Sequence, residues 1–415
     1  MEKIYLIIYL FMFKEGFFMD SNLLSPLTRW CEINLNLLSQ NVTQLKKLIP
    51  SKTNIIAVLK DNAYGHSDII IAKELVSLGI NFFAVSHVDE GIRLRENGIN
   101  SDILILSYTA PKNFQLLFQY NFTQTLISLE YATKLNYFCK SNGYKIKTHV
   151  KIDTGMHRLG LFYDGKKKDI SDILEIYNLC HLDITGTFTH FAVADSLNPK
   201  DISYTKNQYK LFNELISALK EKGINPGVLH TQNSSAVLNY PNFKYDYVRV
   251  GSLLFGIPYG DISTSPESKN FKSLFSLKAK VSVIKNLPPD SKVSYGLNFT
   301  TPNPEKIAIV SIGYGDGYPR SLSNKHAQVI VNNHLAEVIG NICMDQLIIN
   351  ATSIPNIKEG DTVTLIGSSN NYDISIDSIA SMANTLNNEV LDHINARVPR
   401  VYIKNNKTFI KFLIF

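Results

Sequence analysis

The sequence predicts an α/β protein in which an N-terminal (β/α)8 TIM-type barrel is followed by a mainly antiparallel β C-terminal domain. Two observations lead to this prediction. Apolar, β-rich segments alternate with helical segments over about 200 residues, which is typical of a barrel with one packed core. After Gly260 the pattern changes to short strands separated by turn residues, which indicates antiparallel pairing.

The eight barrel strands are expected where short apolar runs are rich in β-branched or aromatic residues. In chain order these runs are 54–59, 82–85, 103–106, 122–127, 148–152, 184–190, 228–231 and 247–255. Helical periodicity is clearest between them, at 67–78, 129–140, 170–180 and 202–222. An open doubly wound sheet is the alternative, but no glycine-rich dinucleotide loop follows the first strand.

The second domain is expected to contain the strands 277–284, 307–312, 329–331, 336–339 and 362–366. Asn332 and Asn333 supply the turn between two of them. A helical segment at 374–396 and a basic C-terminal strand complete the chain. We therefore place the barrel domain at residues 19–268 and the β-rich domain at 269–415.

Residues 1–18 are predicted to be an extension outside the folded core. Their apolar run, 4–13, is too short to span a bilayer, and no small-residue cleavage site follows it. A weak export or anchor signal is the alternative interpretation.

Composition indicates an ordinary globular protein of the cytoplasm that binds neither nucleic acid nor membrane. The net charge is +6, and the basic residues are scattered apart from the short run Lys166–Lys168. The four cysteines lack the spacing of a metal site, so we expect reduced thiols and no metal.

Polar side chains recur where the predicted barrel strands end. In a barrel of this kind, the carboxyl ends of the strands carry the chemistry. A lysine there is more often a surface residue, but Lys, His, Arg and Ser on one rim are harder to explain by packing. The residues concerned are Lys60, Lys151, Asp153, His190, Ser234, Arg249 and Gly251.

Two of these positions suggest particular roles. Lys60 ends the first buried strand, and its amine could form a Schiff base if burial lowers its pKa. The loops after strands seven and eight commonly bind phosphate. The hydroxyl of Ser234 and the open backbone of Gly251 suit that task.

These residues lie in motifs that resemble those of the alanine racemases, enzymes of the pyridoxal-phosphate fold-type III class. The resemblance runs from about Trp30 to Arg400 and rests on several motifs in the same order. The segment 57–66 (AVLKDNAYGH) implies that Lys60 is the Schiff-base lysine and that Tyr64 contacts the phosphate of pyridoxal 5'-phosphate. Ser234, Gly251 and Ser252 are implied as further phosphate contacts, and Arg249 as the partner of the cofactor's ring nitrogen.

The same resemblance implies substrate-binding residues. Segment 151–160 (KIDTGMHRLG) matches the motif whose arginine, here Arg158, binds the substrate carboxylate. Lys151 matches a lysine that is carbamylated in many members and then holds that arginine. In the β domain, 342–346 (ICMDQ) implies that Met344 contacts the substrate. Segments 312–320 (IGYGDGYPR) and 397–400 (RVPR) match an entrance motif and a C-terminal signature.

Racemisation requires a base on each face of a planar carbanion. Lys60 is the natural base on one face, and Tyr295, in the family's second-base motif 293–296 (VSYG), on the other. A phenol with a pKa of about 10 needs cationic neighbours to act as a base. We expect protonated His190, with Arg249 behind it, to supply that charge.

Arg249 also distinguishes among related activities. A permanently charged arginine leaves the cofactor's ring nitrogen neutral, whereas fold-type III decarboxylases present an acidic residue there. Non-catalytic carrier proteins of the same fold lack a β domain and hence a Tyr295. The resemblance therefore implies an alanine racemase that supplies D-alanine for peptidoglycan, as a homodimer with shared active sites.

Five positions depart from the family pattern, and two of them, Asp61 and Ser67, are minor variants beside the lysine motif. His157 replaces a small residue, and Asn341 stands where many members carry arginine. Asn388, an implied cofactor contact, stands where a tyrosine is usual. Serine racemases similar to this family also lack that tyrosine, so a serine/alanine racemase, or one of broader specificity, is the alternative activity.

Overall fold

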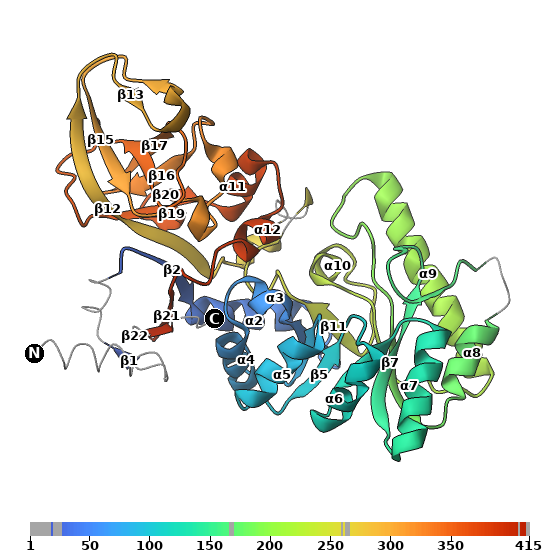
Figure 1. Cartoon of the computed structure of the whole chain (residues 1–415). Helices are drawn as coiled ribbons and strands as arrows, with labels where there is room; N and C mark the ends of the chain where they lie inside the picture. Colours follow the sequence, from blue (N-terminus) through green and yellow to red (C-terminus); the bar gives the residue numbers. More distant parts are fainter. Residues whose placement is uncertain are drawn as a thin grey trace, which may run out of the picture. The chain divides into compact units, whose positions relative to one another are not determined.

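The computed structural model describes residues 18–19, 27–165, 170–258, 260–261, 266–405 and 407–411. The predicted N-terminal extension, apart from Phe18, and the run Lys166–Lys168 therefore lie outside the described residues. The chain forms two compact units, Ser39–Lys272 and a second unit made of Met1–Leu38 with Ser273–Phe415. Figure 1 shows the helices and strands of both. Within the described residues, no helix is both long enough and apolar enough to cross a membrane.

Unit Ser39–Lys272 is the predicted barrel. Its strands pair in parallel around a ring that closes when the last strand pairs with the first, at Val248↔Ile55 and Arg249↔Ile56. The ring order is β3 (Asn54–Val58), β4 (Phe82–Val85), β5 (Asp102–Ile105), β6 (Thr123–Leu126), β7 (Ile146–Asp153), β9 (Leu182–Phe188), β10 (Val228–His230) and β11 (Tyr247–Val250). The closed ring confirms the fold-class prediction and excludes the open sheet.

Helices cover the outside of this ring (Figure 1). They are α4 (Asp68–Ser77), α5 (Val88–Glu96), α6 (Phe114–Gln119), α7 (Leu129–Asn142), α8 (Ser171–Tyr177), α9 (Pro199–Glu221) and the short α10 (Ser234–Asn239). Local sequence explains several helix ends. The Ser128 hydroxyl accepts a hydrogen bond from the Tyr131 N–H at the start of α7, and Gly143 ends it with φ of 70°.

Strand β11 is shorter than predicted. It ends at Val250, because Gly251 and Ser252 begin a turn in which their carbonyls accept hydrogen bonds from Leu254 and Phe255. The apolar run that suggested a strand to residue 255 is instead a buried turn. Because residues 251–255 turn away from the hydrogen-bonded ladder of β11, their backbone N–H groups lie at the end of the barrel.

The second unit is a mainly antiparallel sheet built around the long strand β12 (Phe275–Leu287). Its other strands include β15 (Glu305–Val310), β16 (Gln328–Val331), β17 (His334–Ile339), β18 (Leu347–Asn350) and β19 (Thr362–Ser369). Strands β16 and β17 form a hairpin whose turn residues Asn332 and Asn333 have φ of 48° and 63°, as a two-residue turn requires. The predicted helix at 374–396 is divided into α11 (Ile376–Ala383) and α12 (Asn387–Asp392), because Asn384 ends α11 with φ of 58°.

The first ordered strand of the chain also belongs to this second unit. Strand β2 (Arg29–Asn34) pairs antiparallel with β12 and parallel with β21 (Arg400–Lys404), and β22 (Lys407–Lys411) pairs with β21. We expected residues 19–268 to form one barrel domain. The compact barrel unit begins at Ser39, within helix α2 (Leu35–Leu48), because β2 pairs with strands far along the chain.

Candidate active site

The polar residues that the sequence placed at strand ends lie on one rim of the barrel. Lys60 follows β3, Lys151 and Asp153 lie at the end of β7, and Arg249 lies on β11. His190 follows β9 and Ser234 follows β10. Because the strands of the ring are parallel, all these positions are at its carboxyl end.

Lys60 opens a left-handed turn. The next residues, Asp61, Asn62 and Ala63, have φ between 52° and 55°, and Tyr64 has φ of 54°. Lys60 itself is exposed, so the burial on which its Schiff-base role was made conditional is not met. Its Nζ lies 5.9 Å from the centre of the Tyr64 ring. The turn thus carries the amine out of the β3 ladder and beside an aromatic ring.

Glu90 of α5 holds this turn. One carboxylate oxygen accepts the N–H of Asp61 at 2.5 Å, and the other accepts those of Ser86 and His87 at 2.7 and 2.9 Å. A left-handed helical residue costs roughly 1–2 kcal/mol, so such a turn needs compensating contacts. Sequence reasoning missed Glu90. Its position three residues after the N-cap residue His87 was the available signal, because it is a usual capping position.

Arg249 is buried and donates to five acceptors. They are the carbonyls of Thr189, His230 and Thr231 and the Nδ1 atoms of His190 and His230, at 2.8–3.2 Å. A guanidinium can only donate, so both imidazoles accept at Nδ1 and carry their proton on Nε2. His230 Nε2 then donates to His149 Nδ1 at 2.9 Å. The network fixes the tautomers of all three histidines.

The charge of this network lies on Arg249. Burial, followed by the charge of Arg249, holds the pKa of His190 and His230 well below the usual range. The same causes lower the pKa of His149 to about 3. Burial also lowers the pKa of Arg249 to about 9, which still leaves it charged at neutral pH. The expectation of a protonated His190 is therefore wrong: His190 is a neutral imidazole that accepts a hydrogen bond from the cationic Arg249.

The residues predicted to bind phosphate, termed the anion cradle, lie at the ends of β10 and β11. The Ser234 hydroxyl accepts hydrogen bonds from the N–H groups of Gly251 and Leu253 at 3.1 and 3.3 Å. A Cβ at Gly251 would lie 2.6 Å from the Tyr64 hydroxyl oxygen, so only glycine allows Tyr64 to approach this closely. Ser252 is buried in the same turn. Tyr64, Ser234 and Gly251 are therefore brought together, as the sequence predicted.

Lys151 is buried near two cationic residues. Burial, followed by the charges of Arg158 and Arg249, lowers its pKa to about 8. No ion pair joins Lys151 to Asp153 in the described structure. Asp153 instead accepts the N–H groups of Gly155, Met156 and His157, each at 3.0 Å. His157 has φ of 55°, which explains why a small residue is usual there, and the neighbouring Arg158 is exposed.

Two of the predicted residues of the β-rich unit lie at its surface. Tyr295 and Met344 have exposed fractions of 73% and 54%. The Tyr295 carbonyl accepts a hydrogen bond from the Asn341 side chain at 2.6 Å, so the unusual asparagine supports the second-base segment. The side-chain oxygen of Asn388, on α12, is buried and has no hydrogen-bond partner among the described residues.

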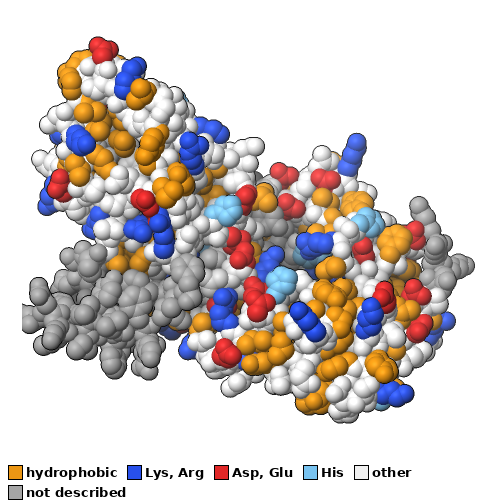
Figure 2. Space-filling model, viewed as in Figure 1, with side chains coloured by type: hydrophobic (Ala, Val, Ile, Leu, Met, Phe, Trp, Pro, Cys, Tyr) orange, Lys and Arg blue, Asp and Glu red, His pale blue; other side chains and the backbone are white. Residues whose placement is uncertain are grey.

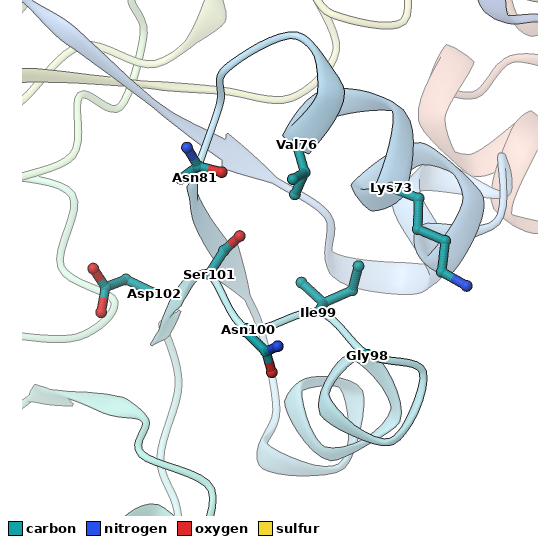
Figure 3. Close-up of a pocket in the computed structure, with 8 residues that line it drawn as sticks. All are labelled: Lys73, Val76, Asn81, Gly98, Ile99, Asn100, Ser101 and Asp102. Carbon is teal, nitrogen blue, oxygen red and sulfur yellow. The ribbon is translucent and has the colours of Figure 1, made fainter.

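A separate cavity of about 540 Å³ opens at the opposite end of the barrel (Figure 3). It is lined by residues around the starts of β4 and β5, including Asn81 and Asp102, and it contains none of the predicted site residues. On the face drawn in Figure 2, positive side chains are interspersed with acidic and apolar ones. The described residues hold no cluster of three or more potential His, Cys, Asp or Glu metal ligands.

The barrel, with a lysine after its first strand and a serine–glycine cluster at the ends of its last two, is an architecture typical of barrel enzymes, whose chemistry lies at this rim. Comparisons with known proteins are more specific. The family model "Alanine racemase, N-terminal domain" matches residues 33–258, and "Alanine racemase, C-terminal domain" matches 274–402. The chain therefore belongs to the alanine racemase family, whose members are isomerases.

Individual relatives agree with this assignment. The alanine racemase of Clostridium perfringens is 38% identical over 91% of this chain and 96% of its own length. An amino-acid racemase of Enterococcus faecalis is 37% identical over 89% of this chain, which corresponds to 51% of that protein. The solved alanine racemase of Clostridium difficile 630 is 36% identical, with a TM-score of 0.83 over 93% of this chain and 99% of that chain.

Proposed function

We propose that this protein interconverts L- and D-alanine with pyridoxal 5'-phosphate, using Lys60 and Tyr295 as the two bases. One observation supports the proposal most strongly. An exposed amine at the end of β3, a buried arginine on β11 and the anion cradle lie on the same rim of the barrel. A solved alanine racemase of Bartonella henselae, 26% identical to this chain, is described with covalently bound pyridoxal phosphate.

The residues of the rim suit this cofactor. Tyr64, Ser234, Gly251 and Ser252 would hold its phosphate, because the hydroxyl groups of Tyr64 and Ser234 meet at the Gly251 turn. Arg249 would face the ring nitrogen and leave it unprotonated. When bound, the cofactor supplies an electron sink that makes the substrate α-proton acidic.

The two bases would differ in how they are supported. The Lys60 amine, freed from the cofactor by the incoming amino acid, would take or return a proton on one face of the α-carbon. Tyr295 would serve the other face. Neutral His190 accepts at Nδ1 from Arg249, so its Nε2–H is available to donate to a phenolate. The positive charge of Arg249 would thereby stabilise the phenolate through an uncharged imidazole.

The substrate carboxylate would be bound by Arg158 and by the Met344 segment. The backbone N–H of Met344 has no acceptor among the described residues and is available to an anion. We infer that Lys151 is carbamylated and holds Arg158, because its low pKa favours the reactive neutral amine.

We further infer that the protein works as a cytoplasmic homodimer with shared sites, and supplies D-alanine for peptidoglycan. The exposure of Tyr295 and Met344 supports sharing, because both side chains are free to reach another chain. Serine racemisation is a second candidate activity, favoured by the unpartnered side-chain oxygen of Asn388.

Racemisation of alanine, serine and other amino acids by the cofactor-loaded protein tests the proposal. Lys60→Ala should abolish the visible absorbance of the bound cofactor and nearly all turnover. Tyr295→Phe should lower the rate by about 10²–10⁴-fold, while α-proton exchange in deuterated water survives for the enantiomer whose proton faces Lys60.

Tyr372→Phe is a matched control, because Tyr372 is a partly exposed tyrosine on β20 (Tyr372–Ile374) of the same unit. It should leave the rates unchanged. Equal loss of exchange for both enantiomers in Tyr295→Phe would make Tyr295 structural, and unchanged visible absorbance in Lys60→Ala would refute the lysine assignment.

A further inference from the structure

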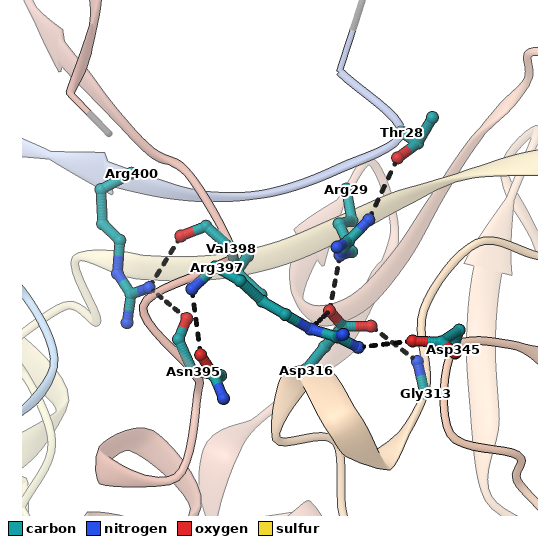
Figure 4. Close-up of polar contacts among 9 residues, drawn as sticks. All are labelled: Thr28, Arg29, Gly313, Asp316, Asp345, Asn395, Arg397, Val398 and Arg400. Carbon is teal, nitrogen blue, oxygen red and sulfur yellow. Dashed lines mark hydrogen bonds and ion pairs between the residues drawn. The ribbon is translucent and has the colours of Figure 1, made fainter. Parts of the chain in front are cut away.

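Asp316 is the buried centre of a charged cluster in the β-rich unit (Figure 4). One carboxylate oxygen accepts from Arg29 Nε at 2.5 Å and from Arg397 Nε at 2.8 Å. The other accepts the N–H of Gly313 at 3.0 Å. Three segments far apart in sequence thus meet at one carboxylate. A buried carboxylate requires partners of this kind. The role of the cluster follows from what Arg397 contacts next.

Arg397 extends the cluster to a second carboxylate. Its Nη2 donates to Asp345 Oδ1 at 2.7 Å, while its Nε is held by Asp316. The planar guanidinium fixes the angle between these two bonds. The hydrogen bond to Asp345 comes first among the causes that raise the pKa of Arg397, followed by effects that include the charge of Asp316. Asp345 directly follows Met344, so Arg397 anchors that segment from one side.

The loop that contains Asp316 anchors the same segment from the other side. Tyr314 N–H donates to the Cys343 carbonyl at 3.0 Å, and Gly315 N–H donates to the Met344 carbonyl at 2.8 Å. The approach is close: a Cβ on Gly313 would lie 2.2 Å from the Cys343 carbonyl oxygen, and one on Gly315 would lie 2.7 Å from Arg397 Nη2. The Asp316 carboxylate stabilises this loop by accepting the Gly313 N–H.

These contacts determine where the Met344 N–H points. The Cys343 carbonyl and the Met344 N–H belong to one planar trans peptide and point in opposite directions. Because Tyr314 holds that carbonyl, the Met344 N–H is directed away from the Asp316 loop, and it has no acceptor among the described residues. The Met344 carbonyl and Asp345 are held as well, so the peptide cannot rotate without breaking several bonds.

We propose that Asp316, Arg397 and Asp345 are positioning residues that aim the Met344 N–H at the carboxylate of the amino-acid substrate. This inference rests on the proposed function and deepens it. It gives one physical reason for the presence of three separate motifs, 312–320, 342–346 and 397–400, in the same unit. Aiming an N–H at a carboxylate contributes equally before and during the chemical step, so its loss should appear in KM and not in kcat.

Asp345→Ala tests the proposal in the cofactor-loaded protein, because Asp345 is exposed and its removal should not disturb folding. We expect KM for alanine to rise roughly 5-fold or more, with kcat changed less than about 2-fold and Tm unchanged. Propionate, used as a competitive carboxylate probe, should bind more weakly by a similar factor. Asp345→Glu keeps a carboxylate and should recover most of the loss.

Arg29→Met is the matched control. It removes the other guanidinium on Asp316, which donates to Asp316 but has no hydrogen bond to residues 343–345. It should lower Tm and leave KM and the propionate constant unchanged. Unchanged KM and propionate binding in an active Asp345→Ala protein, or equal shifts in Arg29→Met, would overturn the positioning role alone. No racemisation by the unaltered protein would overturn the proposed function and this inference together.

Discussion

Arg249 determines the electrostatics of the barrel rim through hydrogen-bond geometry. A guanidinium has no acceptor, so each histidine facing it must offer an unprotonated nitrogen. The sequence predicted both His190 and Arg249 but expected a second positive charge on His190, which burial and Arg249 prevent. The burial of His190 and its contact with Arg249 are tertiary properties, which the local sequence around residue 190 does not contain. Local sequence supplied the candidate residues here but not their protonation states.

Lys151 provides a residue-scale prediction that depends on pH. Carbamylation requires the neutral amine, and a pKa of about 8 gives an appreciable neutral fraction at neutral pH. As the pH falls below about 8, the amine gains a proton, so the carbamate should be lost towards acid pH. ¹³C NMR with labelled bicarbonate should show a carbamate signal at about pH 8 that disappears in Lys151→Ala.

Turnover gives an independent check of Lys151. The Lys151→Ala protein should lose activity, and small carboxylic acids should partly restore it by supplying the missing anion beside Arg158. An unmodified lysine mass together with no rescue by acetate would contradict the prediction. Lys147→Ala, on the same strand but exposed and paired with Asp102, is the control that should need no rescue.

Asn388 provides the second residue-scale prediction. Its side-chain oxygen is buried without a partner in the described structure, and leaving such an acceptor unpaired costs about 1–3 kcal/mol. The hydroxyl of serine could satisfy it, so Asn388→Tyr should lower the serine-to-alanine ratio of kcat/KM. Asn388→Ala removes the acceptor without adding a phenol and should lower the ratio too. A ratio that is negligible in the unaltered protein, or that does not fall, would refute the idea.

At the scale of secondary-structure elements, the left-handed turn after Lys60 matters most, because it sets the position of the Lys60 amine. The strand before it and the helix after it follow from local patterns: β3 spans Asn54–Val58, and α4 spans Asp68–Ser77. The turn residues between them, Asp61–Tyr64, include no glycine, and only Asp61 and Asn62 are of types that favour positive φ. Its conformation depends on a carboxylate from another helix, and such long-range contacts are not visible in a single sequence.

Glu90→Gln tests the importance of that contact. The amide keeps one acceptor oxygen and replaces the other by a donor, so it cannot accept from Asp61 and from Ser86 and His87 together. The unpaired N–H groups should lower the free energy of unfolding by about 1–3 kcal/mol. Cofactor retention after dialysis, measured by absorbance, should fall because the Lys60 turn is less well held. Glu96→Gln, an exposed change on the same helix, should have neither effect.

For the whole molecule, the sequence predicted the architecture correctly, but it did not predict which strands belong to each unit. Alternating periodicity was enough to predict a barrel followed by an antiparallel sheet. The hydrophobic pattern of β2, by contrast, is short and does not indicate which strand it pairs with. Its place beside β12 and β21 depends on hydrogen-bonded pairs more than two hundred residues apart in the sequence. Sequence patterns report local periodicity well, but they do not report which distant strand completes a sheet.

Shared active sites lead to a prediction for the whole molecule. If Tyr295 of one chain serves the barrel rim of another, inactive Lys60→Ala and Tyr295→Phe chains should complement each other. Random exchange makes about half of the dimers mixed, and each mixed dimer has one intact site of two, so roughly a quarter of the unaltered activity should return. Each variant should be unfolded and refolded alone as a control, and racemisation should be followed against mixing ratio. Activity that never exceeds the sum of the two separate variants would show that each chain completes its own site.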